Sequence, residues 1–525
     1  MKYYLLATLA LFTLGGAFSV LRQMQMFQQN SYFPSRYLKW FRLNLSPAYA
    51  LSIGILFITS ALCAVNATHY IIVFAIAEVA VRIPLAIKQY KHSIKKLVFT
   101  KRVLRLYFAI CIFYIALLFI AGFFPCPATY IIVLTAAHIS PAVLLICNSI
   151  VSPVEKLISL KFINEAKKIM GQNKDLLVIG VTGSYGKTSV KFILKRILSE
   201  KFNTVATPES FNTPMGIVRT VREHMRPSTE VFIAEMGAKN IGDIKELCNL
   251  CHPTHGIITA VGPQHLETFL TIENVAATKF ELAEECFSNG GNVYVNFDSP
   301  EAAKYAESNY TDKPVISYGS VSGTNAAAKN ISVSPAGTSF TLSYKNHKID
   351  LSCKLLGRHS ITNILGAASL ALDLGLSESQ IRFAVASLKP TPHRLEIKPF
   401  LNGSILIDDA YNANPVGCME AISVLGSFDS MKKIIVTPGL VELGDGEYEH
   451  NQRLGRAAAK VCDIIILVGE KRAELIKNGI TTSGFDTKNL HVVHSFANAM
   501  QLLKTITDDK TAVLFENDLP DNYAG

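Results

Sequence analysis

The sequence predicts a membrane domain of α-helices followed by an α/β part built on parallel sheets. Long apolar runs are confined to the first 152 of the 525 residues. The same segment holds 13 of the 51 Lys and Arg residues but only one of the 41 Asp and Glu residues. After Asp175, short β-rich runs alternate with helical stretches, which is typical of a parallel sheet with crossover helices.

Each apolar run approaches the ~20 residues that a helix needs to cross a bilayer. The runs are Tyr4 to Leu21, Ala48 to Val65, Tyr70 to Ile87, Leu106 to Phe124 and Tyr130 to Val151. A cleaved signal peptide is an alternative for the first run, but no clear small-residue cleavage site follows it. We therefore expect five transmembrane helices in residues 1–152.

Basic residues set the expected orientation, because Lys and Arg are retained on the cytoplasmic side of short loops. The first and third loops carry them: Arg22, Arg36, Lys39, Arg42, Lys88, Lys91, Lys95, Lys96, Lys101 and Arg102. This predicts a multi-pass protein of the plasma membrane, with its N-terminus outside and everything after Ser152 in the cytoplasm. Since the net charge of +10 belongs to these loops, it does not indicate nucleic-acid binding.

The third run contains a pair of opposite charges. Glu78 and Arg82 are four residues apart, so they share one helical face and can pair inside the bilayer. Such a pair either stabilises the helix bundle or guides a substrate, and both readings stay open.

The α/β part divides in two at Pro390 to Pro392, where the alternating pattern pauses. Strands are expected at Leu176 to Gly180, Val231 to Met236 and Gly256 to Val261, then at Ile405 to Asp408, Lys433 to Val436 and Ile464 to Val468. A polar stretch from Ser317 to Lys348 predicts a small antiparallel excursion. We expect a middle domain at 153–389 and a Rossmann-like C-terminal domain at 390–525.

The stretch "LLVIGVTGSYGKTSV", Leu176 to Val190, predicts a buried strand, a glycine turn and a helix. Such a turn lets backbone N–H groups and the helix N-terminus bind phosphate, with a lysine on the phosphate oxygens and a hydroxyl on Mg²⁺. Val181 replaces the first glycine of the usual pattern, but the flanking strand and helix favour a nucleotide loop over a structural turn. The expected phosphate contacts are Gly183, Ser184, Tyr185, Gly186, Lys187, Thr188 and Ser189.

Several segments in order resemble the Mur ligases, ATP-dependent enzymes that build the peptidoglycan stem peptide. They are "GVTGSYGKTSVK", "ESFNTPMGI", "AEMGAKNIGDI", "TAVGPQHLETFLTIENVAATKFEL", "GRHSITNILGAASLAL", "PHRLEI", "IDDAYNANP" and "GLVELG". They are most similar to the branch that adds D-alanyl-D-alanine, and the resemblance runs from about Asp175 onward. It implies a P-loop middle domain and acyl-phosphate chemistry driven by ATP.

The resemblance also implies roles for single residues. Glu235 and His265 match Mg²⁺ ligands, Thr188 matches a ligand of another such ion, and Lys279 matches a lysine that carries a carbamate and becomes a further Mg²⁺ ligand. The nucleotide contacts are implied to be Asn363 to adenine, Arg394 to the phosphates and Asp409 to the ribose, while Asn212 and Thr213 face the carboxylate substrate. The plain alternatives are a buried histidine at 265, a surface lysine at 279 and a turn-forming aspartate at 409.

One departure concerns the N-terminus, where the resemblance implies a domain that grips the UDP end of the substrate. This sequence has apolar spans there instead. The carboxylate partner is therefore expected to be either UDP-muramoyl-tripeptide or a lipid-linked cell-wall precursor, and the amine partner one such as D-Ala-D-Ala. A transport-coupled ATPase and a catalytically dead scaffold are weaker alternatives, because neither explains Lys279 together with Glu235 and His265.

Overall fold

The computed structural model describes residues 2–44, 47–64, 75–76, 79–80, 96–410, 413–441, 443 and 446–517. By its contacts the chain forms two compact units, residues 1–160 with 519–525, and residues 161–518. Each unit is described by itself.

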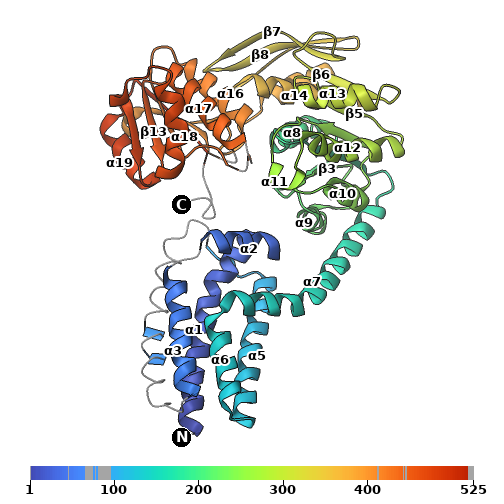
Figure 1. Cartoon of the computed structure of the whole chain (residues 1–525). Coiled ribbons are helices and arrows are strands. Elements are labelled where there is room, and N and C mark those ends of the chain that lie inside the picture. Colours follow the sequence, from blue (N-terminus) through green and yellow to red (C-terminus); the bar gives the residue numbers. More distant parts are fainter. Residues whose placement is uncertain are drawn as a thin grey trace. The chain divides into compact units, whose positions relative to one another are not determined.

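The first unit consists of helices (Figure 1). They are α1 (Lys2–Gln29), α2 (Pro34–Leu43), α3 (Pro47–Ala64), α5 (Lys101–Phe123), α6 (Pro127–His138) and α7 (Ser140–Gly171). Apolar side chains of α1, α5 and α7 pack together around Phe27, Ile110 and Leu144, all of which are fully buried. Within the described part of the chain, two helices are long and apolar enough to cross a membrane, α5 and α7.

The structure corrects the expected fifth span, Tyr130 to Val151, which is not one helix. α6 ends at His138 and α7 begins at Ser140, with Ile139 at φ −99° and ψ 57° between them. The physical reason is Pro141, which has no N–H to donate and whose ring obstructs the preceding turn. α7 then continues through Pro153 to Gly171, past the end expected at Val151. The third run, with Glu78 and Arg82, falls mostly outside the described residues.

The second unit contains two sheets. The first has nine strands in the order β2-β3-β1-β4-β5-β6-β7-β8-β9. Its strands are β1 (Leu177–Thr182), β2 (Thr204–Ala206), β3 (Val231–Glu235), β4 (His255–Ile258), β5 (Val293–Asn296), β6 (Val315–Gly319), β7 (Ala326–Ser334), β8 (Gly337–Tyr344) and β9 (His347–Cys353). The strands from β2 to β7 pair in parallel and β7, β8 and β9 pair antiparallel, which confirms the expected excursion.

Helices cover both faces of this sheet. One face packs on α8 (Lys187–Leu198), α14 (Arg358–Asp373) and α15 (Glu378–Ala386). The other packs on α9 (Pro214–His224), α10 (Asp243–Cys251), α12 (Ile272–Ser288) and α13 (Pro300–Asn309). Because side chains alternate along a strand, Ile179 and Val181 of β1 face the first group while Val178 faces the second.

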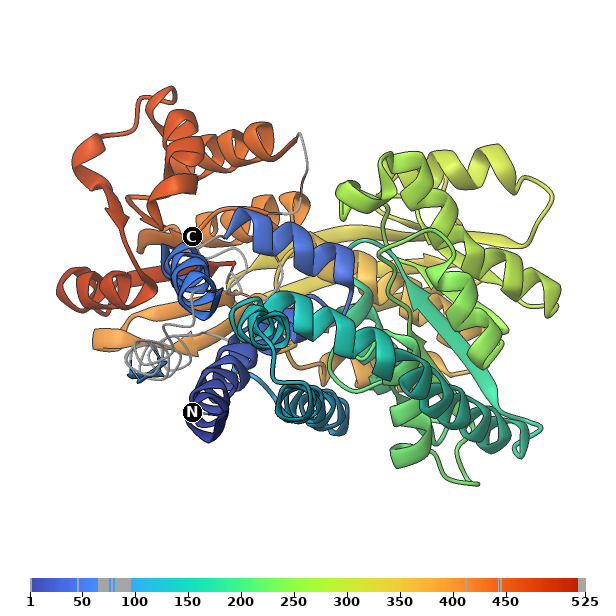
Figure 2. The same cartoon turned by 60° about the horizontal axis from the view of Figure 1, so that its bottom comes forward.

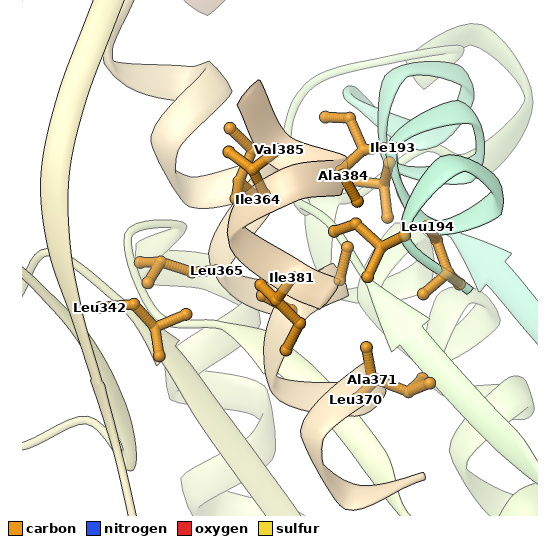
Figure 3. Close-up of a cluster of buried hydrophobic side chains, with 14 of the residues drawn as sticks. Ile193, Leu194, Leu342, Ile364, Leu365, Leu370, Ala371, Ile381, Ala384 and Val385 are labelled. Carbon is orange, nitrogen blue, oxygen red and sulfur yellow. The ribbon is translucent and has the colours of Figure 1, made fainter. Parts of the chain in front are cut away.

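α14 fixes the position of α8. Every residue of α14 from Ser360 to Leu372 is buried, so this helix is surrounded by protein on all sides. Ile364 and Leu365 lie in one apolar cluster with Ile193 and Leu194 of α8 and with residues of α15 (Figure 3). This packing fixes the position of α8, whose first turn directly follows the glycine turn.

The second sheet has six strands in the order β10-β11-β15-β12-β13-β14. They are β10 (Glu396–Pro399), β11 (Ile405–Asp409), β12 (Lys432–Thr437), β13 (Ile464–Val468), β14 (Leu490–Val493) and β15 (Thr511–Glu516). All neighbours pair in parallel except β10 with β11. Helices α16 (Pro415–Gly426), α17 (Glu447–Val461) and α18 (Glu470–Thr481) cover one face and α19 (Phe496–Ile506) the other (Figures 1 and 2).

Candidate active site

The glycine turn lies between β1 and α8, as the sequence predicts. Gly183 has φ +146° and Gly186 has φ +83°, backbone conformations that side chains rarely adopt. A Cβ atom on Gly183 would lie 2.1 Å from Oγ1 of Thr259, so the turn also needs glycine for space. The backbone N–H of Ser184 donates to the carbonyl oxygen of Ala260 at 2.7 Å, which ties the turn to the segment after β4.

Lys187, the first residue of α8, folds back over this turn. Its Nζ donates to the carbonyl oxygens of Gly183 at 2.7 Å and Ser184 at 3.1 Å. Burial lowers the pKa of Lys187 to about 8, with the nearby charge of Arg394 adding to the effect and Glu235 opposing it. The ammonium therefore lies over the glycine turn, where phosphate oxygens could replace the two neutral carbonyl oxygens as acceptors of its hydrogen bonds.

Glu235 ends β3 beside the start of α8, and its side chain is 1% exposed. Oε1 accepts hydrogen bonds from Oγ1 of Thr188 at 3.1 Å and from Nδ2 of Asn212 at 3.2 Å. Oε2 accepts one from Nζ of Lys191 at 2.9 Å. The structure thus brings together Thr188, Glu235 and Asn212, which the sequence singles out, and adds Lys191, which it does not.

A hydroxyl beside a carboxylate is the hard oxygen donor set that Mg²⁺ prefers. Thr188 and Glu235 fit such an ion in chemical type. Among the residues that the structure describes, no three His, Cys, Asp or Glu side chains form a group able to hold a metal ion.

His265 lies in the segment after β4, at φ +53°, and caps the short helix α11 (Leu266–Phe269). Tyr185 of the glycine turn reaches this segment, because its Oη donates to the carbonyl oxygen of Pro263 at 2.8 Å. Ser184 adds a contact with Gly262, whose N–H donates to Oγ at 3.1 Å. The turn and the segment that carries His265 are therefore fastened to each other.

Lys279 lies on α12 and is only 2% exposed, so it is not a surface lysine. Burial, together with the positive charge of Lys187, lowers the pKa of Lys279 to about 7, and the carboxylates of Asp243 and Glu281 act in the opposite direction. Nζ lies 5.8 Å from the centre of the Phe269 ring. An amine that loses its proton near neutral pH can react with CO₂, which a fully protonated lysine cannot do.

A cavity of about 530 Å³ opens beside α8. Its wall includes Ser189, His359, Asn363, Pro390 and Arg394, so it joins three predicted site residues to the segment between the two sheets. Oδ1 of Asn363 lies 3.1 Å from the place of a Cβ on Gly186, which puts this amide against the glycine turn. The cavity lining mixes apolar residues such as Ile193 and Leu388 with polar and charged ones.

The remaining predicted residues have visible structural roles. Asp409 ends β11, where its Oδ1 accepts the N–H of Leu395 at 3.1 Å. Burial raises the pKa of Asp409 to about 6, and that hydrogen bond and Arg394 oppose the rise. Thr213 caps α9 by accepting the N–H of Gly216 at 3.3 Å. Neither Asp409 nor Thr213 lines the cavity.

Sequence reasoning missed Lys191. Its side chain is fully buried, although lysine is seldom buried without a partner. A signal was present, because Lys191 lies one helical turn after Lys187 in "GKTSVK" and so shares its side of α8. The partner Glu235 is 44 residues away, and only the pairing of β1 with β3 brings the two together.

The two sheets, the glycine turn and the adjoining cavity define an α/β protein with a nucleotide loop in its middle domain. Residues 181–371 match the Mur ligase middle domain, and residues 393–516 match the glutamate ligase domain of the Mur ligases. The chain belongs to the Mur ligase family.

Within that family, the chain is similar to UDP-N-acetylmuramoyl-tripeptide--D-alanyl-D-alanine ligases. It is 32% identical to the enzyme of Mycobacterium bovis over 307 residues, 57% of this chain and 59% of that one. It is 30% identical to the enzyme of Escherichia coli, over 56% of this chain and 65% of that one. The match thus spans about three fifths of the length of these relatives.

Solved structures of MurF ligases are also similar to this chain. The MurF structure from Acinetobacter baumannii superposes with a TM-score of 0.62 at 26% identity, covering 69% of this chain and 77% of that one. The MurF ligase from Thermotoga maritima in complex with ADP gives 0.61 at 25% identity, covering 70% and 81%.

Proposed function

We propose that this chain is a MurF-like ATP-dependent ligase that joins the carboxylate of UDP-N-acetylmuramoyl-tripeptide to the amine of D-alanyl-D-alanine. The observation that carries the proposal is the contact of Thr188 with Glu235 beneath the glycine turn, with Lys187 and the buried Lys279 nearby. A merely structural glycine turn requires none of these groups. Relatives named for this activity support the choice of substrates.

The reaction has two steps in this proposal. The substrate carboxylate attacks the γ-phosphorus of ATP, ADP leaves and an acyl phosphate forms. The amine then attacks the acyl carbon and inorganic phosphate leaves. Activation is needed because an oxide ion is a far poorer leaving group than phosphate.

The residues divide this work by position. Backbone N–H groups of residues 183–188 hold the phosphates, and Lys187 exchanges its carbonyl acceptors for phosphate oxygens. Asn363 and Arg394 hold the nucleotide in the cavity beside α8. Asp409, which does not line this cavity, contacts the ribose only when the two ligase domains close. Asn212 and Thr213 face the carboxylate substrate.

Mg²⁺ ions would offset the repulsion between the phosphate and carboxylate charges. Glu235, His265 and a carbamate on Lys279 would hold one ion, and Thr188 another. The carbamate turns a buried cation into an anionic oxygen ligand. Burial of Lys279 beside Lys187 supports this, because it favours the neutral amine that carbamylation requires.

We propose further that residues 1–152 form a multi-pass membrane domain, in which the last apolar run is broken at Ile139, with residues 153–389 and 390–525 as cytoplasmic ligase domains. An exposed apolar stripe on α5 supports contact with lipid; its members are Leu104, Phe108, Ile112, Ile115, Phe119 and Phe123. The first expected span coincides with part of α1 and the second with α3. The membrane domain confines the ligase to the surface where cell-wall precursors become lipid-linked.

The test uses the purified full chain and its fragment 153–525, each with ATP, UDP-N-acetylmuramoyl-tripeptide and D-alanyl-D-alanine. We expect phosphate release that depends on all three, together with a product heavier by one dipeptide less one water. ATP hydrolysis without product, or no turnover, contradicts the ligase proposal. If the full chain ligates a lipid-linked precursor and the nucleotide substrate is inert, the carboxylate partner is the lipid-linked one.

A further inference from the structure

Lys191 is a buried charge that the proposed reaction does not use. Its side chain is 0% exposed in the middle of α8. Burying an ammonium costs free energy unless it is paired and hydrogen-bonded, so the contacts of this group indicate what it holds in place.

Two acceptors from different parts of the chain meet at Nζ of Lys191. One is Oε2 of Glu235 at 2.9 Å, on the end of β3. The other is the backbone carbonyl oxygen of Glu209, which also accepts a hydrogen bond from Nζ. The ring centre of Phe192 lies 4.5 Å away. The ammonium thus connects α8, β3 and the loop that contains Glu209.

That loop, residues 207–213, carries Asn212 and Thr213. It meets β3 at further points: Oγ1 of Thr207 accepts the N–H of Glu235 at 3.1 Å, and Asn212 donates to Oε1 of the same residue. Glu209 itself has φ +41°, which an L residue adopts only when its surroundings hold it there. Lys191 is the charged contact at this point of the loop.

We propose that Lys191 is a positioning residue that couples loop 207–213 to the nucleotide site. One ammonium holds both the carboxylate beside Thr188 and the backbone of the loop. Lys191 therefore adds a charged contact to the Thr207 and Asn212 hydrogen bonds that set the spacing between the substrate loop and the phosphate-binding turn. The coupling rests on the proposed function for its effect on catalysis, but its effect on the loop does not.

Hydrogen–deuterium exchange of the full chain tests whether Lys191 holds loop 207–213 in place. Lys191→Met keeps the aliphatic stem and removes the charge. We expect amide exchange at Glu209 to Thr213 to become about tenfold faster or more, as loss of a charge-assisted hydrogen bond predicts. Lys195→Met is the matched control, because Lys195 is exposed one turn further along α8. In Lys195→Met, amide exchange at residues 209–213 should equal that of the wild type.

Kinetics tests the consequence. Lys191→Met should raise KM for the carboxylate substrate about tenfold, and more than it raises KM for ATP, because the loop that faces the carboxylate has lost its tie. Lys191→Arg keeps the charge and should restore part of the loss. A purely structural role would lower the amount of folded enzyme without this separation of the two constants.

The single variant leaves Glu235 buried without its cation and can fail to fold. The double variant Lys191→Met/Glu235→Gln removes both charges, so exchange can be measured in it instead. If the loop stays as protected as in the wild type in either variant, or if both KM values match those of Lys195→Met, the proposal is wrong. If loop exchange becomes faster in Lys191→Met but the wild-type chain does not join the two substrates, the proposed function is wrong and the role of Lys191 in holding the loop still stands.

Discussion

The hydroxyl of Thr188 donates a hydrogen bond of 3.1 Å to Oε1 of Glu235, across 47 residues of sequence. The contact arises because β1 and β3 pair in parallel with Val181 opposite Glu235. Parallel strands end at the same edge of the sheet, so the glycine turn after β1 and the carboxylate at the end of β3 meet there. This edge is where the proposed chemistry takes place.

Replacement of Lys187 by Ala should abolish ligation. The ammonium at the mouth of the turn is removed, and loss of one positioned donor to developing charge slows catalysis more than about 100-fold. Product formation and binding of a fluorescent ATP analogue measure the two effects, with Lys195→Ala as control. Ligation within tenfold of the wild-type rate would show that this turn does not bind the reacting phosphates.

Replacement of Asn363 by Ala should weaken binding of the nucleotide base. The amide can donate and accept at once, and its loss should lower ADP affinity about tenfold. Inorganic triphosphate supplies the control, since it has no base and should bind the variant and wild type equally. Equal ADP affinity in calorimetry would place the base elsewhere.

The carbamate on Lys279 predicts chemical rescue. Lys279→Ala removes a proposed Mg²⁺ ligand and leaves a space where a small acid fits. Ligation should fall strongly and be partly regained with millimolar short carboxylates, but not with chloride at equal ionic strength. Full activity of the variant without any added acid would mean that the lysine is not a ligand.

Lys279 should also give stability a distinct pH dependence. Its pKa is about 7 in the folded chain, against 10.5 for an ordinary lysine, so between these values the unfolded chain holds the extra proton. Stability of the wild type relative to Lys279→Met should therefore rise with pH over this window, by up to about 1.4 kcal/mol per pH unit. Denaturant unfolding in CO₂-free buffer measures it. Lys245→Met, at an exposed position of α10, leaves Lys279 in place and should keep the pH dependence of the wild type.

The expected topology can be tested in intact cells. Ser93 lies outside the described residues, in the loop that the sequence places in the cytoplasm. A cysteine at Ser93 should resist a membrane-impermeant thiol reagent, whereas one at Thr68, in the expected external loop, should react. Labelling at Ser93 before lysis would mean that the orientation is the reverse of the expected one or that residues 1–152 do not form a membrane domain.

Local sequence determined much of this protein. The strand, glycine turn and helix around Gly183 are as predicted, because backbone freedom at glycine and the apolar pattern act within a few residues. The positions along the chain of β1, β3, β4, β11, β12 and β13, and the antiparallel excursion, also follow from local patterns. Where a local signal was overlooked, at Pro141, the expectation of one continuous helix from Tyr130 to Val151 was wrong.

Tertiary structure alone decided which distant groups meet. It placed Lys191 between Glu235 and Glu209, set Asn363 against Gly186 and buried Lys279 near Lys187. None of these contacts follows from spacing along the chain, because the partners lie on separate elements that only sheet pairing and helix packing bring together. The lowered pKa of Lys279 has the same origin, since desolvation and neighbouring charge depend on what surrounds a group in space.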